Sequence, residues 1–196
     1  MSFGCVKPDV GICRRLNAAL IGIAFLLGAC NSGGVRETLD EETFVSVIVA
    51  EPPVTFFRLP ESGPYDRELV SVGLVDIIAS RQRDIYLWIN NWGTRADGST
   101  GDRALPEMIT LSTASRELVL NRSADTHTTL GLSSAPYTSV RSGPGEAYFA
   151  VSAEDLAQLA NDGPAEIRLG DAVYALWGDQ RRGINALRQY VNESRL

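Results

Sequence analysis

Two long apolar segments constrain the fold more than any other feature of this 196-residue chain. They are RELVSVGLVDIIA (67–79) and DIYLWINNWGT (84–94), which meet at the polar stretch SRQRD (80–84). Valine, isoleucine and aromatic residues favour strands, because branched and ring side chains pack well on a pleated surface. The pattern predicts an antiparallel hairpin with residues 80–84 as its loop, so the chain must build a sheet around it.

Side-chain alternation divides the residues of this hairpin between two faces. With the five-residue loop, one face is purely aliphatic and contains Val75, Ile77, Leu87 and Ile89. The other face mixes aromatic and polar side chains and is a candidate binding face, formed by Tyr86, Trp88, Trp92, Asp76 and Asn90. Two interpretations are open. Either this face meets water, a sugar or another protein, or helices of the C-terminal half cover it as core.

Shorter strand patterns flank the hairpin on both sides. TFVSVIVA (43–50) and VTFFRL (54–59) predict two strands, split by a Pro-Pro pair because proline is tolerated only at strand ends or edges. MITLS (108–112) and RELVLN (116–121) predict a second hairpin. Residues 122–145 are rich in Ser, Thr, Gly and Pro, which predicts a long loop or an irregular edge.

The C-terminal part predicts, in order, a strand, a helix, a hairpin and a helix. The first helix begins at Ser152, with Asp155 in a capping-box position, and ends at Gly163-Pro164, while Asp179 caps the second helix. The segments are AYFAV (147–151), SAEDLAQLAND (152–162), AEIRL (165–169), AVYALW (172–177) and a last apolar helix face of Ile184, Leu187, Tyr190 and Val191. The predicted fold class is therefore α+β, a mainly antiparallel sheet with this C-terminal unit, in a single globular domain over residues 44–196.

The N-terminal residues are typical of an export signal. Arg14 and Arg15 precede an uncharged run that is apolar from residue 18 to residue 30, which is too short for a bilayer because a spanning helix needs about 20 residues. The alternative is a short buried helix, but such a helix would carry polar residues on its outer face, and this run has none. The run ends in Leu27-Gly28-Ala29-Cys30, which resembles the bacterial lipobox.

The resemblance to a bacterial lipoprotein implies that residues 1–29 are a signal peptide removed before Cys30. It implies that the Cys30 thiol carries a diacylglyceryl group and that the new amino end takes a fatty acid such as palmitate. Residues 30–43, which are small, polar and acidic, are then a flexible tether. Asn31 stands where enterobacterial lipoproteins carry a retention aspartate, which implies the periplasmic side of the outer membrane; the inner membrane stays open, since other bacteria read different signals. The tail, with YLWINNW, is similar to uncharacterised envelope lipoproteins of Gram-negative bacteria, and this similarity implies no activity.

Residue types that support metal or nucleophilic chemistry are scarce. His127 is the only histidine, whereas a catalytic zinc site needs about three protein ligands, so neither a metal site nor a cofactor is expected. Ser123, Asp125 and His127 alternate in sequence, which on a strand would separate neighbours by about 6.6 Å, too far for a hydrogen-bonded relay. ADGSTGDRALPE lacks the glycine and the bidentate glutamate of a calcium loop, and RSGPGEAY lacks the lysine of a phosphate loop. No cysteine follows Cys30, so no disulfide is expected.

The charge of the chain excludes nucleic acid as a partner. The formal net charge is −6, and the part after Cys30 is more acidic still because Lys7, Arg14 and Arg15 precede it. Nucleic-acid binding requires a basic stripe, and the arginines here are scattered. The expected function is that of a lipid-anchored envelope protein with a binding or scaffolding role, which contacts the membrane through Cys30 and has an envelope protein or a glycan as partner. The alternative is a small hydrolase that cleaves envelope glycans with two carboxylates about 5 to 9 Å apart.

Overall fold

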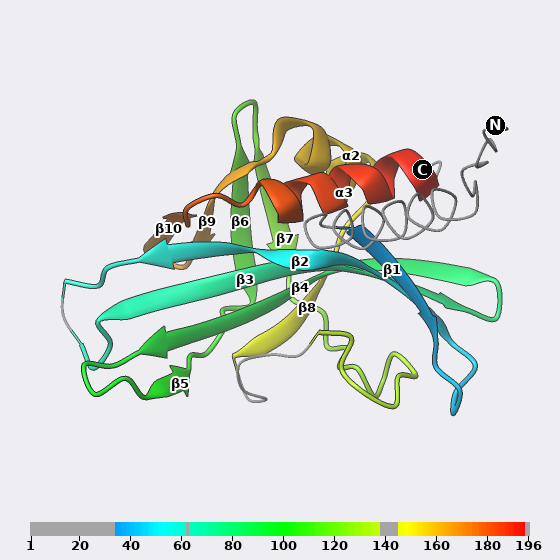
Figure 1. Cartoon of the computed structure of the whole chain (residues 1–196), viewed down its shortest axis with the longest axis horizontal. Coiled ribbons are helices and arrows are strands. Elements are labelled where there is room, and N and C mark those ends of the chain that lie inside the picture. Colours follow the sequence, from blue (N-terminus) through cyan, green and yellow to red (C-terminus); the bar gives the residue numbers. More distant parts are fainter. Residues whose placement is uncertain (1–33, 62, 138–144, 195–196) are drawn as a thin grey trace, which may run out of the picture. The chain divides into compact units, whose positions relative to one another are not determined.

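A computed structural model describes residues 34–61, 63–137 and 145–194, which belong to one compact unit of the chain. Within these residues, ten strands form one sheet and two helices pack on it (Figure 1). The elements are β1 (Gly34–Leu39), β2 (Ser46–Arg58), β3 (Arg67–Ala79), β4 (Gln82–Thr94), β5 (Thr100–Asp102), β6 (Met108–Thr113), β7 (Glu117–Asn121), β8 (Glu146–Ala150), α2 (Ala153–Asp162), β9 (Pro164–Leu169), β10 (Ala172–Leu176) and α3 (Arg181–Ser194). The α+β class with a mainly antiparallel sheet is confirmed.

The strand order of the sheet is β5-β4-β3-β2-β10-β9-β6-β7, with β1 beside β2 and β8 beside β4. Every strand pair is antiparallel. Arg122, directly after β7, forms an isolated bridge with Phe149 of β8. The sheet therefore curls until the end of β7 meets β8. Neither of the two described helices has the length and hydropathy needed to cross a bilayer.

β3 and β4 form the predicted hairpin, but the connection between them is shorter than the sequence predicts. The turn consists of Ser80 and Arg81, whose φ angles are 49° and 70°, and Ala79 pairs directly with Gln82. Positive φ at both central positions is the backbone of a type I′ turn, whose twist matches that of the flanking strands. The predicted loop, which extends to Asp84, is therefore partly strand.

The shorter turn shifts the pairing of β4 with β3 by an odd number of residues. The prediction of which β3 residues lie on the same face as which β4 residues is therefore wrong. Gly73 lies opposite Trp88 and Asp76 lies opposite Ile85. Asp76 therefore lies on the side of Leu87 and not on the side of Trp88. The alternation within β4 itself is as predicted, with one side formed by Tyr86, Trp88, Asn90 and Trp92.

β2 is one strand of 13 residues where the sequence predicts two shorter strands. Its register with β3 shifts between Ala50 and Val54, and Pro52 and Pro53 lie within this shift. A bulge leaves residues of one strand unpaired, so it accommodates prolines that a regular ladder would reject. The two prolines therefore mark an irregularity inside a strand and do not end it.

β1 pairs with the first half of β2, from Gly34 opposite Glu51 to Leu39 opposite Ser46. The prediction that residues 30–43 form a tether is therefore wrong for residues 34–39, and the folded domain begins before residue 44. Four of the six residues of β1 are exposed, so its composition resembles that of a solvated linker. Cys30 and the predicted signal peptide lie outside the described residues.

Each face of the sheet buries its own apolar cluster. The helices α2 and α3 cover one face (Figure 1), where their buried residues pack on a cluster that includes Val72, Leu74, Leu87 and Ile89. Residues 130–137 cover the opposite face, where the cluster includes Val75, Tyr86, Trp88, Leu132, Tyr137 and Tyr148. The interpretation in which C-terminal helices cover the Trp88 face is therefore wrong. Irregular chain covers that face, and the helices lie on the other one.

Tyr137 holds the covering segment on the sheet. Its ring stacks on Trp88 with centroids 4.9 Å apart, and its hydroxyl lies 2.7 Å from the Ala50 carbonyl oxygen and 2.8 Å from that of Leu74. The same ring lies over Gly73, where a Cβ atom would come within 2.5 Å of it. Only glycine leaves room at position 73, because any side chain would displace the ring.

β1 and the turn after it also hold the covering segment. Arg36 pairs with Glu51 at 2.8 Å and donates a hydrogen bond to the Pro136 carbonyl at 3.2 Å. The Asp40 carboxylate accepts hydrogen bonds from the backbone N–H and the hydroxyl of Ser133, both at 2.7 Å. These bonds favour the charged form and lower the pKa of Asp40 to about 2. The segment is thus fixed at three points: by Tyr137, by Arg36 and by Asp40.

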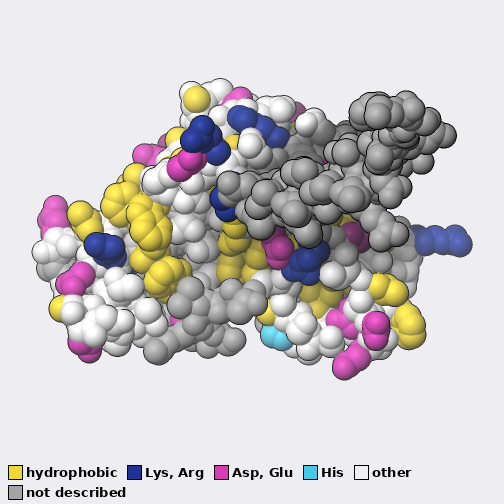
Figure 2. All heavy atoms as spheres, in the orientation of Figure 1, with side chains coloured by type: hydrophobic (Ala, Val, Ile, Leu, Met, Phe, Trp, Pro, Cys, Tyr) yellow, Lys and Arg dark blue, Asp and Glu magenta, His cyan; other side chains and the backbone are white. Residues whose placement is uncertain are grey.

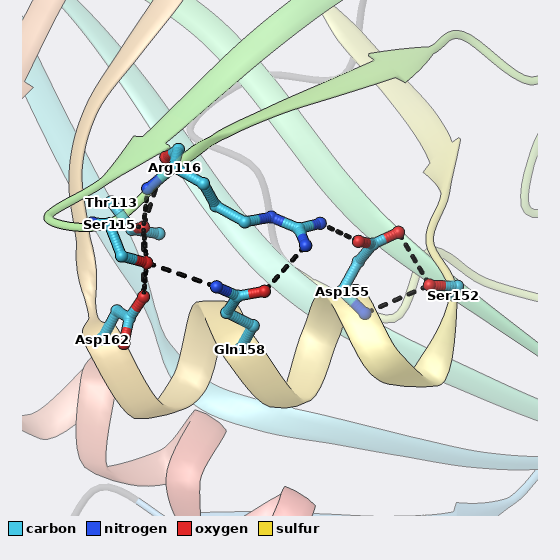
Figure 3. Close-up of polar contacts among 7 residues, drawn as sticks. All are labelled: Thr113, Ser115, Arg116, Ser152, Asp155, Gln158 and Asp162. Carbon is cyan, nitrogen blue, oxygen red and sulfur yellow. Dashed lines mark hydrogen bonds and ion pairs between the residues drawn. The ribbon is translucent and has the colours of Figure 1, made fainter.

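α2 is capped as predicted and is joined to the turn between β6 and β7 (Figure 3). The Ser152 side chain accepts a hydrogen bond from the Asp155 N–H at 3.1 Å, and Gly163, with φ of 78°, follows the helix. Arg116 of the turn forms an ion pair with the Asp155 carboxylate and donates a hydrogen bond to Gln158 at 2.7 Å. These contacts hold the helix against the sheet.

α3 crosses β2 at close range. A Cβ atom on Gly183 would come within 2.8 Å of the Pro52 carbonyl oxygen, so glycine permits this approach. The Asp179 carboxylate accepts a hydrogen bond from the Arg181 N–H at 3.1 Å, which satisfies a free donor at the start of the helix, as predicted.

Candidate functional site

The structure separates the five residues of the candidate binding face. Asp76 lies on the helix-covered side and is 0 % exposed. The other four lie on the side covered by residues 130–137, where Tyr86, Trp88 and Asn90 are buried and Trp92 is half-buried. Side chains shielded in this way do not form a surface platform, so these five residues do not make up one exposed binding surface.

Asp76 takes part in a buried network that joins α3 to the β3–β4 hairpin. Arg83 approaches its carboxylate with Nε at 3.1 Å and Nη2 at 2.9 Å, and the Tyr190 hydroxyl donates a hydrogen bond to it at 2.9 Å. Burial, followed by the charge of Asp76, raises the pKa of Tyr190 above its ordinary value. A buried carboxylate with two such partners is satisfied, so this network holds the fold.

Glu68, near the other end of β3, is bound by the same types of side chain. It is 3 % exposed, pairs with Arg58 at 2.9 Å and with Arg103, and accepts a hydrogen bond from the Tyr174 hydroxyl at 3.2 Å. Each of these two buried carboxylates therefore has an arginine and a tyrosine as partners. Neither has capacity left for a ligand.

A cleft of about 660 Å³ opens where the chain leaves β7 and where it enters β8. It is lined by residues 122–127, by Glu146, Ala147 and Tyr148 of β8, and by Glu107 and Ala135. Two backbone hydrogen bonds place the loop, from Arg122 N–H to the Glu107 carbonyl at 2.7 Å and from Ser123 N–H to the Tyr148 carbonyl at 2.8 Å. The volume lies in the range of small-molecule sites, about 300 to 1,000 Å³.

Asp125 is fixed in this cleft by two hydroxyl groups. The Ser123 hydroxyl donates a hydrogen bond to its carboxylate, and the Tyr86 hydroxyl donates another at 3.3 Å. Burial, together with the negative charges of Asp125 and Asp84, raises the pKa of Tyr86 to about 12. Tyr86 thus remains a neutral hydrogen-bond donor well above neutral pH and orients one carboxylate of the cleft.

Ser123, Asp125 and His127 all line this cleft, and they lie on a loop, as predicted for residues 122–145. The Ser123 hydroxyl is committed to Asp125, and the described contacts include no hydrogen bond from the His127 side chain. A nucleophilic relay requires the histidine to join the other two. The residues are therefore brought together, but without the order of contacts that this chemistry needs.

Tyr148 and Glu146 are the residues of the cleft that sequence reasoning missed. Tyr148 is 2 % exposed, and its shielded hydroxyl has no hydrogen-bond partner among the described residues. Burial, and then the nearby charge of Glu146, raises the pKa of Tyr148 above its ordinary value. The only sequence signal is the spacing of the two residues in EAYFA, which places both on one side of a strand.

The charges of the lining are mostly negative. Three lining residues are acidic, namely Glu107, Asp125 and Glu146. Arg122 is the one arginine of the lining, and His127 is its one histidine. Arg122 lies 4.0 Å from Glu107 and donates a hydrogen bond to the Leu105 carbonyl at 3.4 Å, and no ion pair joins it to Asp125 or Glu146 among the described residues. Among the described residues no group of three or more His, Cys, Asp or Glu side chains is placed to hold a metal ion. The arrangement can accept hydrogen bonds and attract positive charge.

Exposed apolar side chains gather elsewhere, over the end of β2 and β10 (Figure 2, left side of the view). Trp177, which follows β10, is 43 % exposed, and Val173 and Leu59 are 40 % and 65 % exposed. Phe57 pairs with Ala175, and Val173 alternates with Ala175 along β10, so Val173 lies on the side of the sheet that Phe57 occupies. The exposed tryptophan of the described structure is thus Trp177, and not Trp88 or Trp92.

Comparison of the chain with protein-family models, with curated proteins and with solved structures finds no match. The cleft must therefore be interpreted from its own chemistry.

Proposed function

We propose that this chain is a lipid-anchored protein of the bacterial envelope whose domain binds a small ligand in the cleft beside β8. Cys30 carries the lipid, and the periplasmic side of the outer membrane is its destination, with the inner membrane as the alternative. The lipobox pattern supports the anchor. The observation that carries the binding role is the cleft of about 660 Å³, lined by a buried tyrosine whose hydroxyl has no partner among the described residues.

The anchor is tested by labelling cells with a fatty-acid probe. Two or three acyl chains on one residue hold a protein stably on a membrane, so the wild-type chain should be labelled and should sediment with membranes. In Cys30→Ser both properties should vanish. A Cys30→Ser protein that is still labelled and still membrane-bound would show that the lipid is elsewhere.

The binding role is tested by filling the cleft. Ala124 lies in the lining and is exposed, so Ala124→Trp places a large side chain in the opening without removing a polar group. Saturation-transfer NMR with a digest of purified peptidoglycan should detect bound sugar with the wild type and none with Ala124→Trp. Ala153→Trp, at an exposed position on α2, is the matched control and should behave as the wild type. Equal signals from all three proteins would exclude the cleft as the site.

A hydrolase acting on envelope glycans is the second candidate, favoured by Asp125 and Glu146 lining one cleft. It ranks second because the Asp125 carboxylate already accepts hydrogen bonds from two protein hydroxyls. Fewer of its lone pairs are then available to a substrate. Release of new reducing ends from purified peptidoglycan by the wild type, and its loss in Asp125→Asn, would reverse this order.

A further inference from the structure

The cleft contains two polar groups that the protein itself leaves unsatisfied. The Tyr148 hydroxyl is shielded from solvent without a partner, and no hydrogen bond or ion pair to the Glu146 carboxylate occurs among the described residues. Buried polar groups are usually hydrogen-bonded, because leaving one unpaired costs about 1 to 3 kcal/mol. A ligand that pairs with the Tyr148 hydroxyl would remove that cost, and the half-buried Glu146 carboxylate can accept hydrogen bonds from the same ligand.

The two groups lie close enough to act together. They occupy alternate positions of β8, where side chains share one side of the strand, opposite Asn90 and Trp88 of β4. The charge of Glu146 contributes to the raised pKa of Tyr148, as expected of groups that lie near each other. A carboxylate only accepts hydrogen bonds, whereas a tyrosine hydroxyl both donates and accepts.

The charge around this pair selects for a cation. Arg122 also lines the cleft, but its contacts are with Glu107 and the Leu105 carbonyl, and among the described residues no ion pair joins Asp125 or Glu146 to a basic side chain. Two carboxylates in a partly enclosed site attract positive charge more strongly than they would in open water. A metal ion fits poorly, since no suitable ligand group is present in the described part of the chain.

We infer that the cleft takes a hydroxylated ligand that carries a protonated amine, with the chemistry of a sugar whose amino group is not acetylated. The ammonium group binds the Glu146 carboxylate, and a neighbouring hydroxyl of the ligand pairs with Tyr148. Asp125, already oriented by Ser123 and Tyr86, adds to the negative potential. This inference rests on the proposed binding role of the cleft and specifies its ligand class.

The experiment compares three probes, glucosamine, N-acetylglucosamine and glucose, by NMR titration of the full chain in detergent near neutral pH. A hydrogen bond to a charged group adds about tenfold or more in affinity, so glucosamine should bind at least about tenfold more tightly than the other two sugars. High salt should weaken glucosamine binding alone. Glu146→Gln keeps the shape of the side chain and should remove the preference for glucosamine.

Two further variants separate the roles of the groups. Tyr148→Phe should weaken binding of all three sugars by a few-fold while the preference for glucosamine remains. Glu154→Gln is the matched control, because Glu154 is exposed on α2 and does not line the cleft, and it should change nothing beyond about twofold.

The possible failures are distinguishable. N-acetylglucosamine or glucose bound as tightly as glucosamine, and blocked by Ala124→Trp, would overturn the ammonium inference and leave the binding role intact. An unchanged preference in Glu146→Gln would also overturn it. If none of the three sugars binds, the inference is wrong, and the peptidoglycan digest then decides whether the binding role is wrong as well.

Discussion

The two faces of the sheet bury polar groups in opposite ways. On the helix-covered face, Asp76 and Glu68 are almost fully buried, and each has an arginine and a tyrosine as partners. On the face covered by residues 130–137, the Tyr148 hydroxyl and the Trp88 indole N–H are equally shielded, yet neither has a partner among the described residues. The buried carboxylates of one face are thus satisfied, although the Asn91 side-chain oxygen on that side has no partner among the described residues, and the other face leaves a hydroxyl and an indole N–H unpaired.

This difference separates groups that serve stability from groups that are available to a ligand. A buried carboxylate with its partners holds elements of the fold together, and removing one partner leaves a buried charge uncompensated. An unpaired buried hydroxyl lowers stability, and a ligand group that pairs with it recovers that loss on binding. The unpaired hydroxyl lines the cleft, whereas the satisfied carboxylates are closed off by their partners on the opposite side of the sheet, and this is why we place the site on the loop-covered face.

The largest expected effects come from neighbouring residues on opposite faces of β4. Trp88 is 2 % exposed and Leu87 is 0 % exposed. Replacing either with alanine leaves a cavity, so Trp88→Ala should lower the free energy of unfolding by about 3 to 5 kcal/mol and Leu87→Ala by about 2 to 5 kcal/mol. Urea denaturation measures both. A Trp88→Ala loss below about 1 kcal/mol would mean that the loop-covered face is not a core.

The next prediction tests the buried ion pair of Asp76 on the helix-covered face. Asp76→Asn keeps the size of the side chain but removes the charge that Arg83 and Tyr190 bind. Breaking a buried ion pair costs about 3 to 5 kcal/mol, and the partial exposure of Arg83, 34 %, places this pair near or below the lower end. Urea unfolding of Asp76→Asn should show this loss, and Arg168→Gln, from the exposed pair with Glu166, should change stability by less than about 1 kcal/mol. Equal losses would contradict a special role for the buried network.

Much of the fold was predictable because local chemistry determines it. Ser152 and Gly163 define the ends of α2, and the apolar content of 67–94 requires a hairpin, independent of the rest of the chain. The turn at Ser80-Arg81 was not predictable, since neither residue is the glycine or asparagine that usually marks a type I′ turn. Because the predicted loop was too long, the prediction assigned Asp76 to the wrong face of the sheet.

The candidate site was less predictable because tertiary contacts create it. Residues 130–137 lack a periodic pattern, and their role depends on the stacking of Tyr137 over Gly73, which are distant in sequence. Nothing local marks Tyr148 as unpaired, since that property depends on what surrounds it in space. Sequence reasoning considered Ser123, Asp125 and His127 only as a relay and rejected it, and it could not show that they share a cleft with β8.

A matched pair of substitutions tests the comparison directly. Tyr190 and Tyr148 are 1 % and 2 % exposed, and Phe in place of either removes only the hydroxyl. Tyr190→Phe loses a hydrogen bond to a charged group and should lower the free energy of unfolding by about 1.5 to 3 kcal/mol. Tyr148→Phe removes an unpaired polar group and should leave the ligand-free protein unchanged or stabilise it by up to about 1 kcal/mol. Thermal and urea unfolding without ligand measure both, and a clear loss in Tyr148→Phe would reveal a partner for its hydroxyl.

The smallest effect concerns pH and the Tyr86 hydroxyl. The pKa of Tyr86 is raised from 10.0 to about 12, because burial and the charges of Asp125 and Asp84 disfavour the phenolate. The folded protein therefore holds this proton more tightly than the unfolded chain, so its contribution to stability is present below pH 10 and is lost as pH rises toward 12. In Tyr86→Phe the free energy of unfolding should fall less steeply over this interval, while near neutral pH the substitution should cost only about 0.5 to 1.5 kcal/mol for the hydrogen bond to Asp125. Urea unfolding at a series of pH values gives both quantities. An equally steep fall in Tyr86→Phe and the wild type would mean that other buried tyrosines alone account for the alkaline loss, and that Asp125 is not held by a neutral hydroxyl.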